Sequence, residues 1–234
     1  MKTKLTALLI ATAALVGGGA AAHAAPIPVA SYTFQGQDDV NAFQKVSGGK
    51  CKRKWAGNQA LGIGVGPSTN NCVFRSSVVG DSSTQYSDQG MVATVTSGGG
   101  TPKLQKKTYV GVGVRHSDTD GYVLRILPTA HKWQYIRDPK GAAPPKPEAS
   151  GSGKFIKLAS KPNVIAIRAF SYGGTTTSVV ASVNGRNVVS STDSGTDQPN
   201  GRQTTVNVGV KGSGAGTGVL GVFDNVTVQV PNPF

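Results

Sequence analysis

Three arginines recur within a short stretch of the chain, in the segments RHSDTDGYVLRI (115–126) and KWQYIRD (132–138), and the second segment adds the aromatic residues Trp133 and Tyr135. A guanidinium group matches planar oxyanions and donates several hydrogen bonds at once. Aromatic rings offer flat, largely apolar surfaces on which the apolar face of a ring-shaped ligand can stack. The candidate ligand-binding residues are therefore Arg115, Arg125, Trp133, Tyr135 and Arg137.

Two hairpins are expected to bring these five residues together. A turn at 117–121 predicts the pairs His116 with Tyr122, Val114 with Leu124, Val112 with Ile126, Arg115 with Val123, and Gly113 with Arg125. Because side chains alternate along a strand, this register separates an apolar face from a polar one. A second turn at PTAH (128–131) places Trp133 opposite Arg125 on the polar face, with Gly111 and Gly113 as its floor. A structural interpretation stays open, in which arginines stacked on aromatic rings stabilise an exposed sheet.

The acidic pair Asp118 and Asp120 matches the first two ligand positions of an EF-hand loop. That loop needs a bidentate Glu at its twelfth position, which is Thr129 in this chain. The flanking segments also fit strands rather than helices, and Asp and Gly are ordinary turn residues. The sequence therefore predicts a hairpin turn here, and no metal-ligating residues.

Recognisable catalytic motifs are absent from the sequence. His116 and His131 leave a Ser-His-Asp arrangement open, since such a triad depends on geometry and not on order. There is, however, no G-x-S-x-G elbow, no phosphate-binding loop, no G-x-G-x-x-G and no metal-binding Cys/His spacing. No catalytic residue and no cofactor are assigned.

The first 24 residues predict a secretory signal peptide. They combine the basic start MKTK, the apolar run LTALLIATAALV and small residues at Ala22 and Ala24 for cleavage. An uncleaved membrane anchor is the alternative, and no later stretch is long and apolar enough to span a bilayer. Removing Lys2 and Lys4 with this segment lowers the formal charge from +13 to +11.

Secretion also bears on the two cysteines. In an oxidising compartment, Cys51 and Cys72 are expected to form a structural disulfide.

The remaining chain, 25–234, is expected to form one all-β domain. Its apolar residues alternate or cluster in short runs, separated by Gly, Ser, Thr, Asn and Pro, which is typical of strands. So many short strands predict an antiparallel two-sheet sandwich, and KFIKLAS (154–160) is counted among them. The segment 138–154 is rich in Pro, Gly and Ser, which predicts a flexible surface loop rather than a domain boundary.

The segments VGVGVRHSDTDGYVLRI, VNGRNV and FDNVTV, in this order, resemble the concanavalin A-like lectin/glucanase superfamily. The resemblance is to the laminin-G-like jelly-roll domains of secreted bacterial proteins in particular, and it covers about Thr108 to Val230. It implies a jelly-roll sandwich of two curved sheets, with Cys51 and Cys72 joining adjacent strands. Members of the superfamily bind glycans, cleave them, or act as non-catalytic modules.

Two features of the superfamily bear on catalysis and on metal binding in this chain. Glucanases of this fold typically carry a Glu-x-Asp-x-x-Glu pattern on one strand, whereas the single Glu of this chain, Glu148, lies in the 138–154 loop. Some laminin-G-like domains hold calcium with carboxylates from separate loops, so the resemblance leaves Asp118 and Asp120 open as calcium ligands.

These observations together predict a secreted, non-catalytic carbohydrate-binding module. The expected partner is a glycan or an anionic cell-envelope polymer, because a basic protein attracts anionic surfaces, while nucleic acid is not expected after secretion. A glycan-active hydrolase or lyase and a structural or protein-interaction module of the envelope remain alternatives. The basic segment KCKRKW (50–55) is interpreted as a solvated strand, with a contact to an anionic polymer as its alternative.

Overall fold

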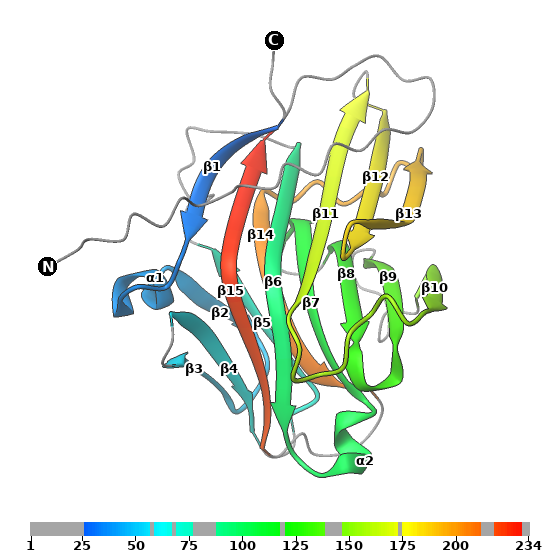
Figure 1. Ribbon diagram of the computed structural model, residues 1–234. Coiled ribbons are helices and arrows are strands. Elements are labelled where there is room, and N and C mark those ends of the chain that lie inside the picture. Colours follow the sequence, from blue (N-terminus) through cyan, green and yellow to red (C-terminus); the bar gives the residue numbers. More distant parts are fainter. Residues whose placement is uncertain are drawn as a thin grey trace, which may run out of the picture.

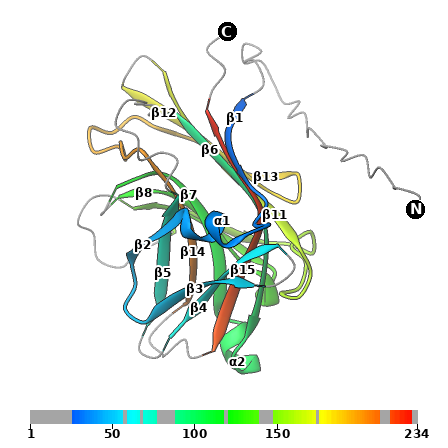
Figure 2. The same cartoon turned by 90° about the vertical axis from the view of Figure 1, so that its left-hand side faces the viewer.

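The computed structural model describes residues 26–56, 59–66, 69–76, 88–117, 120–138, 147–172, 175–211 and 218–230. These residues form two antiparallel sheets that pack face to face (Figures 1 and 2). The predicted signal peptide and Asp118 lie outside the described residues.

Sheet A has eight strands, and seven of them follow the order β13-β12-β11-β6-β15-β4-β3, while β1 also pairs with β15. Their bounds are β1 (Ile27–Tyr32), β3 (Cys51–Ala56), β4 (Ala60–Val65), β6 (Gln89–Gly99), β11 (Asn163–Tyr172), β12 (Thr176–Val183), β13 (Arg186–Asp193) and β15 (Val219–Val230). All of the strand pairings described in this sheet are antiparallel.

Sheet B has seven strands in the order β10-β9-β8-β7-β14-β5-β2, again with antiparallel pairing. Their bounds are β2 (Phe43–Ser47), β5 (Asn71–Ser76), β7 (Thr108–His116), β8 (Gly121–Leu127), β9 (Lys132–Asp138), β10 (Ala149–Ser152) and β14 (Gln203–Val210). The described helical segments are short: α1 (Gln37–Asn41), α2 (Pro102–Gln105) and the 3₁₀ turn η2 (Pro128–Ala130). No helix among the described residues is long and apolar enough to cross a membrane. The predicted all-β jelly-roll sandwich is confirmed.

The core lies between the two sheets and is built by strict alternation along the strands. In β12, every second residue is buried, and the residues between are partly exposed. The inner face of β7 presents Val110, Val112 and Val114, all with no exposed surface. Burying such β-branched side chains from both sheets supplies the hydrophobic stabilisation that joins the layers.

The disulfide between Cys51 and Cys72 forms, as predicted. It does not join adjacent strands, however, because Cys51 begins β3 in sheet A and Cys72 lies in β5 of sheet B. The bond therefore links the two layers. The basic segment 50–55 is the β3 edge of sheet A, where exposed lysines discourage pairing with another chain.

Two local predictions need correction. The end of the predicted 138–154 loop is strand β10, since Ala149–Ser152 pairs with β9, while 139–146 lie outside the described residues. The segment 154–160 is not a strand. It is a chain of turns that buries Ile156 and is fixed by Asn163, whose Oδ1 accepts from the Lys157 backbone N–H at 2.8 Å. Turn geometry and a single buried apolar residue outweigh its alternating pattern.

The β7–β8 hairpin keeps the predicted faces but has a different register. Val114 pairs with Tyr122 and Val112 with Leu124, two residues away from the predicted partners. A shift of two preserves the side-chain alternation, so the apolar face is as predicted. The turn itself is closed by Ser117, whose N–H donates to the Asp120 carbonyl at 2.9 Å and whose hydroxyl also bonds the Asp120 carboxylate.

The β8–β9 pairing differs by one residue, and this changes the outcome. Trp133 pairs with Ile126, and Arg125 pairs with Gln134. The loop between the strands is made of η2 and His131, which has a left-handed conformation, so that Leu127 pairs directly with Lys132. Because a one-residue slip moves every side chain to the opposite face, β9 presents different residues to each side of the sheet than predicted.

Candidate functional site

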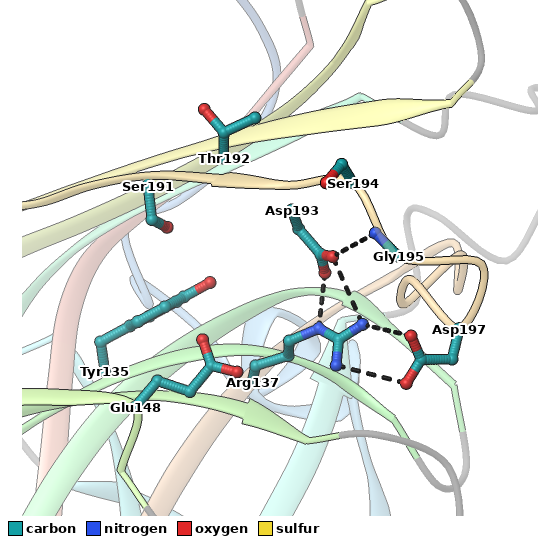
Figure 3. Close-up of a pocket in the computed structure, with 9 residues that line it drawn as sticks. All are labelled: Tyr135, Arg137, Glu148, Ser191, Thr192, Asp193, Ser194, Gly195 and Asp197. Carbon is teal, nitrogen blue, oxygen red and sulfur yellow. Dashed lines mark hydrogen bonds and ion pairs between the residues drawn. The ribbon is translucent and has the colours of Figure 1, made fainter.

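A polar cavity of about 340 Å³ opens at one edge of the sandwich, where β9 and β10 of sheet B face β13 of sheet A. It is lined by Tyr135, Arg137, Glu148, Ser191, Thr192, Asp193, Ser194, Gly195 and Asp197. In Figure 3, Tyr135, Arg137 and Glu148 lie on one side, and the β13 residues lie on the other. We call this the edge pocket.

Arg137 stands at the centre of the edge pocket and is held by two carboxylates. Its Nε donates to Asp193 Oδ2 at 2.5 Å, and its terminal nitrogens donate to Asp197 Oδ1 and Oδ2 at 2.8 and 3.3 Å (Figure 3). The hydrogen bonds that Arg137 donates to Asp197, and then those to Asp193, raise the pKa of the Arg137 guanidinium against the opposing effect of burial. Such charge-assisted forks fix both orientation and position.

Asp193 is the most connected acceptor in the edge pocket. Besides Arg137, it accepts a hydrogen bond from the Tyr122 hydroxyl at 2.7 Å and one from the Gly195 N–H at 3.1 Å. Burial raises the pKa of the Tyr122 hydroxyl, and the neighbouring Asp193 carboxylate adds to this shift. Tyr122 therefore stays a hydrogen-bond donor to Asp193.

Glu148 supplies a third carboxylate. Its backbone N–H donates to the Tyr135 carbonyl at 2.9 Å, which brings the residue before β10 to the edge pocket. Partial burial raises the pKa of the Glu148 carboxyl, the Arg137 charge opposes this shift, and Asp193 adds to it. Three carboxylates against one guanidinium leave the lining with an acidic balance, although the whole chain is strongly basic.

The five predicted site residues do not share one face. Tyr135 and Arg137 line the edge pocket on the inner side of β9. Trp133 also lies on this side, where it is half-buried against the core and covers Gly151, at which an added Cβ would come within 2.7 Å of the indole. The predicted common polar face is therefore wrong, because the β8–β9 register differs by one residue from the expected one.

Arg115 is buried between the sheets rather than exposed on a face. Only 3% of its surface is accessible, and its backbone has a positive φ of 51° at a bulge in the β7–β14 pairing. The bulge turns the side chain inward. There it donates to Asp88 at 2.7 Å, to Thr177 at 2.6 Å and to Ser171.

Arg125 alone of the five points to the outer face of sheet B. Its guanidinium lies 4.5 Å above the centre of the Tyr109 ring, and its Nε donates to Gln134 Oε1 at 2.8 Å. Gly111 is its direct partner on β7, one glycine removed from the predicted Gly113. Of the two predicted floor glycines, Gly111 lies beside Arg125, while Gly113 pairs with Val123. The aromatic partner of Arg125 is Tyr109 and not the predicted Trp133.

Sequence patterns gave no indication of Asp193, Ser191 or Asp197. Asp193 lies 56 residues from Arg137 along the chain, and it ends a strand whose exposed serines and threonines look like ordinary surface positions. The strand alternation in β13, once known, would have placed Ser191 and Asp193 on the inner side together with buried Val189.

Comparisons with known proteins find likeness in structure only. No protein-family model matches the sequence, and no curated protein matches it. An endo-1,3-beta-glucanase from Streptomyces sioyaensis superposes with a TM-score of 0.63 at 12% identity, covering 92% of this chain and 100% of that one. The carbohydrate binding module CBM66 from Bacillus subtilis gives 0.54 at 16%, covering 80% and 95%. A Bacillus subtilis protein with a galectin-like fold gives 0.56 at 10%, covering 90% and 99%.

These structures share the fold of this chain at low sequence identity. The chain therefore has the jelly-roll sandwich of lectin-like and glucanase-like domains. The assignment to laminin-G-like domains in particular stays a prediction, and so does binding by the five sequence-selected residues.

Proposed function

We propose that this protein is a secreted, non-catalytic carbohydrate-binding module that holds a neutral sugar unit of an extracellular or cell-envelope glycan in the edge pocket. The observation that carries this proposal is the lining of that pocket. Within the described residues it gathers four hydroxyl side chains, three carboxylates and one guanidinium around a cavity of about 340 Å³. This volume falls in the lower part of the range of roughly 300–1,000 Å³ known for small-molecule pockets.

Sugar hydroxyls both donate and accept hydrogen bonds, and the edge pocket offers both partners. Glu148 supplies an acceptor, and the Ser191 and Ser194 hydroxyls supply either role, while Asp193 holds Arg137 in position. The ion pairs of Arg137 hold these groups in place before a ligand arrives. Binding to a preorganised site costs little ordering of side chains.

The charge of the lining favours a neutral sugar. Both carboxylate partners of Arg137 are already engaged with it, and Glu148 adds a further negative charge. A uronate or sulfated sugar would meet net repulsion here. The disulfide between Cys51 and Cys72 supports an oxidising compartment, in agreement with secretion.

Filling the mouth of the edge pocket tests the proposal. Ser194 is exposed and lines the cavity. We therefore expect Ser194→Trp to lower the affinity for the neutral glycan that binds best on a glycan array by at least ~10-fold. Ser190→Trp places the same ring on the opposite side of β13 and is expected to change affinity less than ~2-fold. Titration calorimetry measures both, and melting curves check folding. The proposal would be contradicted if the wild-type protein bound no neutral glycan, or if both variants lost affinity equally.

A glycan-active hydrolase is the second candidate, because Glu148 carries a raised pKa and shares the cavity with Asp193. A glycosidase needs a proton-donating acid and a second carboxylate. Here the second carboxylate, Asp193, is occupied by Arg137, Tyr122 and Gly195. A hydrolase would release reducing sugar from polysaccharides, and this release would be lost in Glu148→Gln.

A further inference from the structure

The outer face of sheet B, on the opposite side of the sheet from the edge pocket, carries a second row of mostly polar residues. The row crosses all seven strands and consists of Ser150, Gln134, Arg125, Gly111, Asn207, Val73 and Ser47. With neighbouring strands about 4.8 Å apart, such a row is roughly 30 Å long. Arg125 lies directly beside Gln134 in this row, and Gly111 separates it from Asn207. The Gln134 and Asn207 side chains are largely buried in the sheet surface, with 7% and 5% exposed.

Arg125 differs from the other two arginines of the predicted site in its charge partners. Arg115 pairs with Asp88, and Arg137 pairs with two aspartates. Among the residues that the structure describes, no carboxylate pairs with Arg125, and its neighbours are the neutral groups of Tyr109 and Gln134. A half-buried guanidinium without a counter-charge is unusual, because burial penalises the charged form.

The electrostatics of this pair agree with the geometry. Burial lowers the pKa of the Arg125 guanidinium, and the nearby Tyr109 only partly offsets this effect. Arginine nevertheless remains protonated at neutral pH. The cation is thus held in place by the ring beneath it and by Gln134, with its charge uncompensated by any described residue.

The two glycines beside Arg125 and Tyr109, Gly111 and Gly209, leave no room for a side chain. An added Cβ at Gly111 would lie 2.9 Å from the Arg125 Cβ and 2.7 Å from the Leu124 carbonyl oxygen. At Gly209, on the neighbouring strand, it would meet the Tyr109 hydroxyl at 2.4 Å, because that side chain lies across the glycine to reach Asn71. The flat Tyr109 ring and its stacked guanidinium therefore depend on strand positions without side chains.

We propose that Arg125, resting on Tyr109 with Gln134 beside it and Asn207 beyond Gly111, is a second binding site that takes the carboxylate or sulfate group of an acidic polysaccharide. The guanidinium supplies the counter-charge to a planar or tetrahedral oxyanion, and the amides supply hydrogen bonds to hydroxyls of adjoining sugar units. The length of the polar row and the strongly basic charge of the chain favour a polyanionic chain over a small anion.

The test uses polygalacturonate and dextran sulfate as acidic probes and dextran as the neutral one. Arg125→Gln is expected to lower the affinity for at least one acidic polymer by ~10-fold or more in 0.15 M salt. The affinity of Arg125→Lys is expected to lie between those of the wild type and Arg125→Gln. The matched control is Arg186→Gln, which removes the same charge from another arginine stacked on an aromatic ring, 4.9 Å above Phe155. It is expected to change affinity by less than ~2-fold. Ser194→Trp, which blocks the edge pocket, is expected to leave the acidic polymers bound.

The following results would overturn this second site. Wild-type protein that binds neither acidic polymer more tightly than dextran lacks the site. Equal losses in Arg125→Gln and Arg186→Gln indicate attraction by net charge alone. Binding to phosphatidylglycerol vesicles that Arg125→Gln abolishes, with no binding to either polymer, identifies a lipid ligand instead. Loss of the acidic polymers in Ser194→Trp would place them in the edge pocket.

Discussion

Replacing Arg115 with alanine is expected to lower the free energy of unfolding by about 3 kcal/mol, the cost of breaking a largely buried ion pair. Arg115 has 3% of its side chain exposed, and it joins β7 of sheet B to Asp88, Ser171 and Thr177. Its backbone N–H also donates to Gln89 at 2.9 Å. Alanine leaves the buried Thr177 and the carboxylate of Asp88 without the guanidinium.

Urea unfolding measures this effect. We expect a lower transition midpoint at an unchanged slope, since the variant loses stability without a change in the surface that unfolding exposes. Arg186→Ala is the control, because Arg186 is exposed at the start of β13 and its loss is expected to cost less than ~1 kcal/mol. A loss in Arg115→Ala no larger than that of the control would show that the inter-sheet network contributes little.

Asp193→Asn is expected to weaken neutral glycan binding at least ~30-fold, which corresponds to about 2 kcal/mol. The carboxylate accepts from Arg137, Tyr122 and Gly195. The asparagine amide has the same shape, but one acceptor oxygen becomes an NH₂ donor. That donor would face the N–H or O–H groups that the carboxylate now accepts from. Arg137 and Tyr122 must reorient, and the edge pocket loses its organised geometry.

Asp197→Asn is the matched control for this charge change. Asp197 also pairs with Arg137, but 64% of its side chain is exposed, against 11% for Asp193. Since exposed ion pairs contribute roughly 0–1 kcal/mol, we expect the glycan affinity to fall less than ~5-fold. Calorimetric titration measures the glycan affinity of both variants, and melting curves confirm that both are folded. An Asp193→Asn protein that binds like wild type would remove Asp193 from the binding site.

Much of the fold could be predicted because it depends on local patterns. Strand alternation indicated the inward-facing valines of β7, which the structure buries completely. The lone cysteine pair in a chain predicted to be secreted indicated the disulfide. Which strands the cysteines joined depended on sheet topology, which no local pattern specifies.

The candidate site was less predictable because it depends on register and on distant contacts. The β8–β9 loop decides whether Trp133 or Gln134 lies beside Arg125, and a single residue there reverses the face. The bulge at Arg115 breaks the alternation on which its predicted exposure rested. The edge pocket joins β9 to β13, elements about fifty residues apart, and only the closed sandwich brings Arg137 and Asp193 together.

The most direct test of the central claim is a chemical-shift map of ¹⁵N-labelled protein titrated with the neutral oligosaccharide that binds best on a glycan array. We predict that the largest changes occur at the backbone amides of Ser191, Asp193, Gly195 and Glu148, which line the edge pocket. Changes confined to the outer face of sheet B, at Gly111 and Asn207, or no saturable change with any neutral glycan, would contradict the claim that the edge pocket holds a neutral sugar.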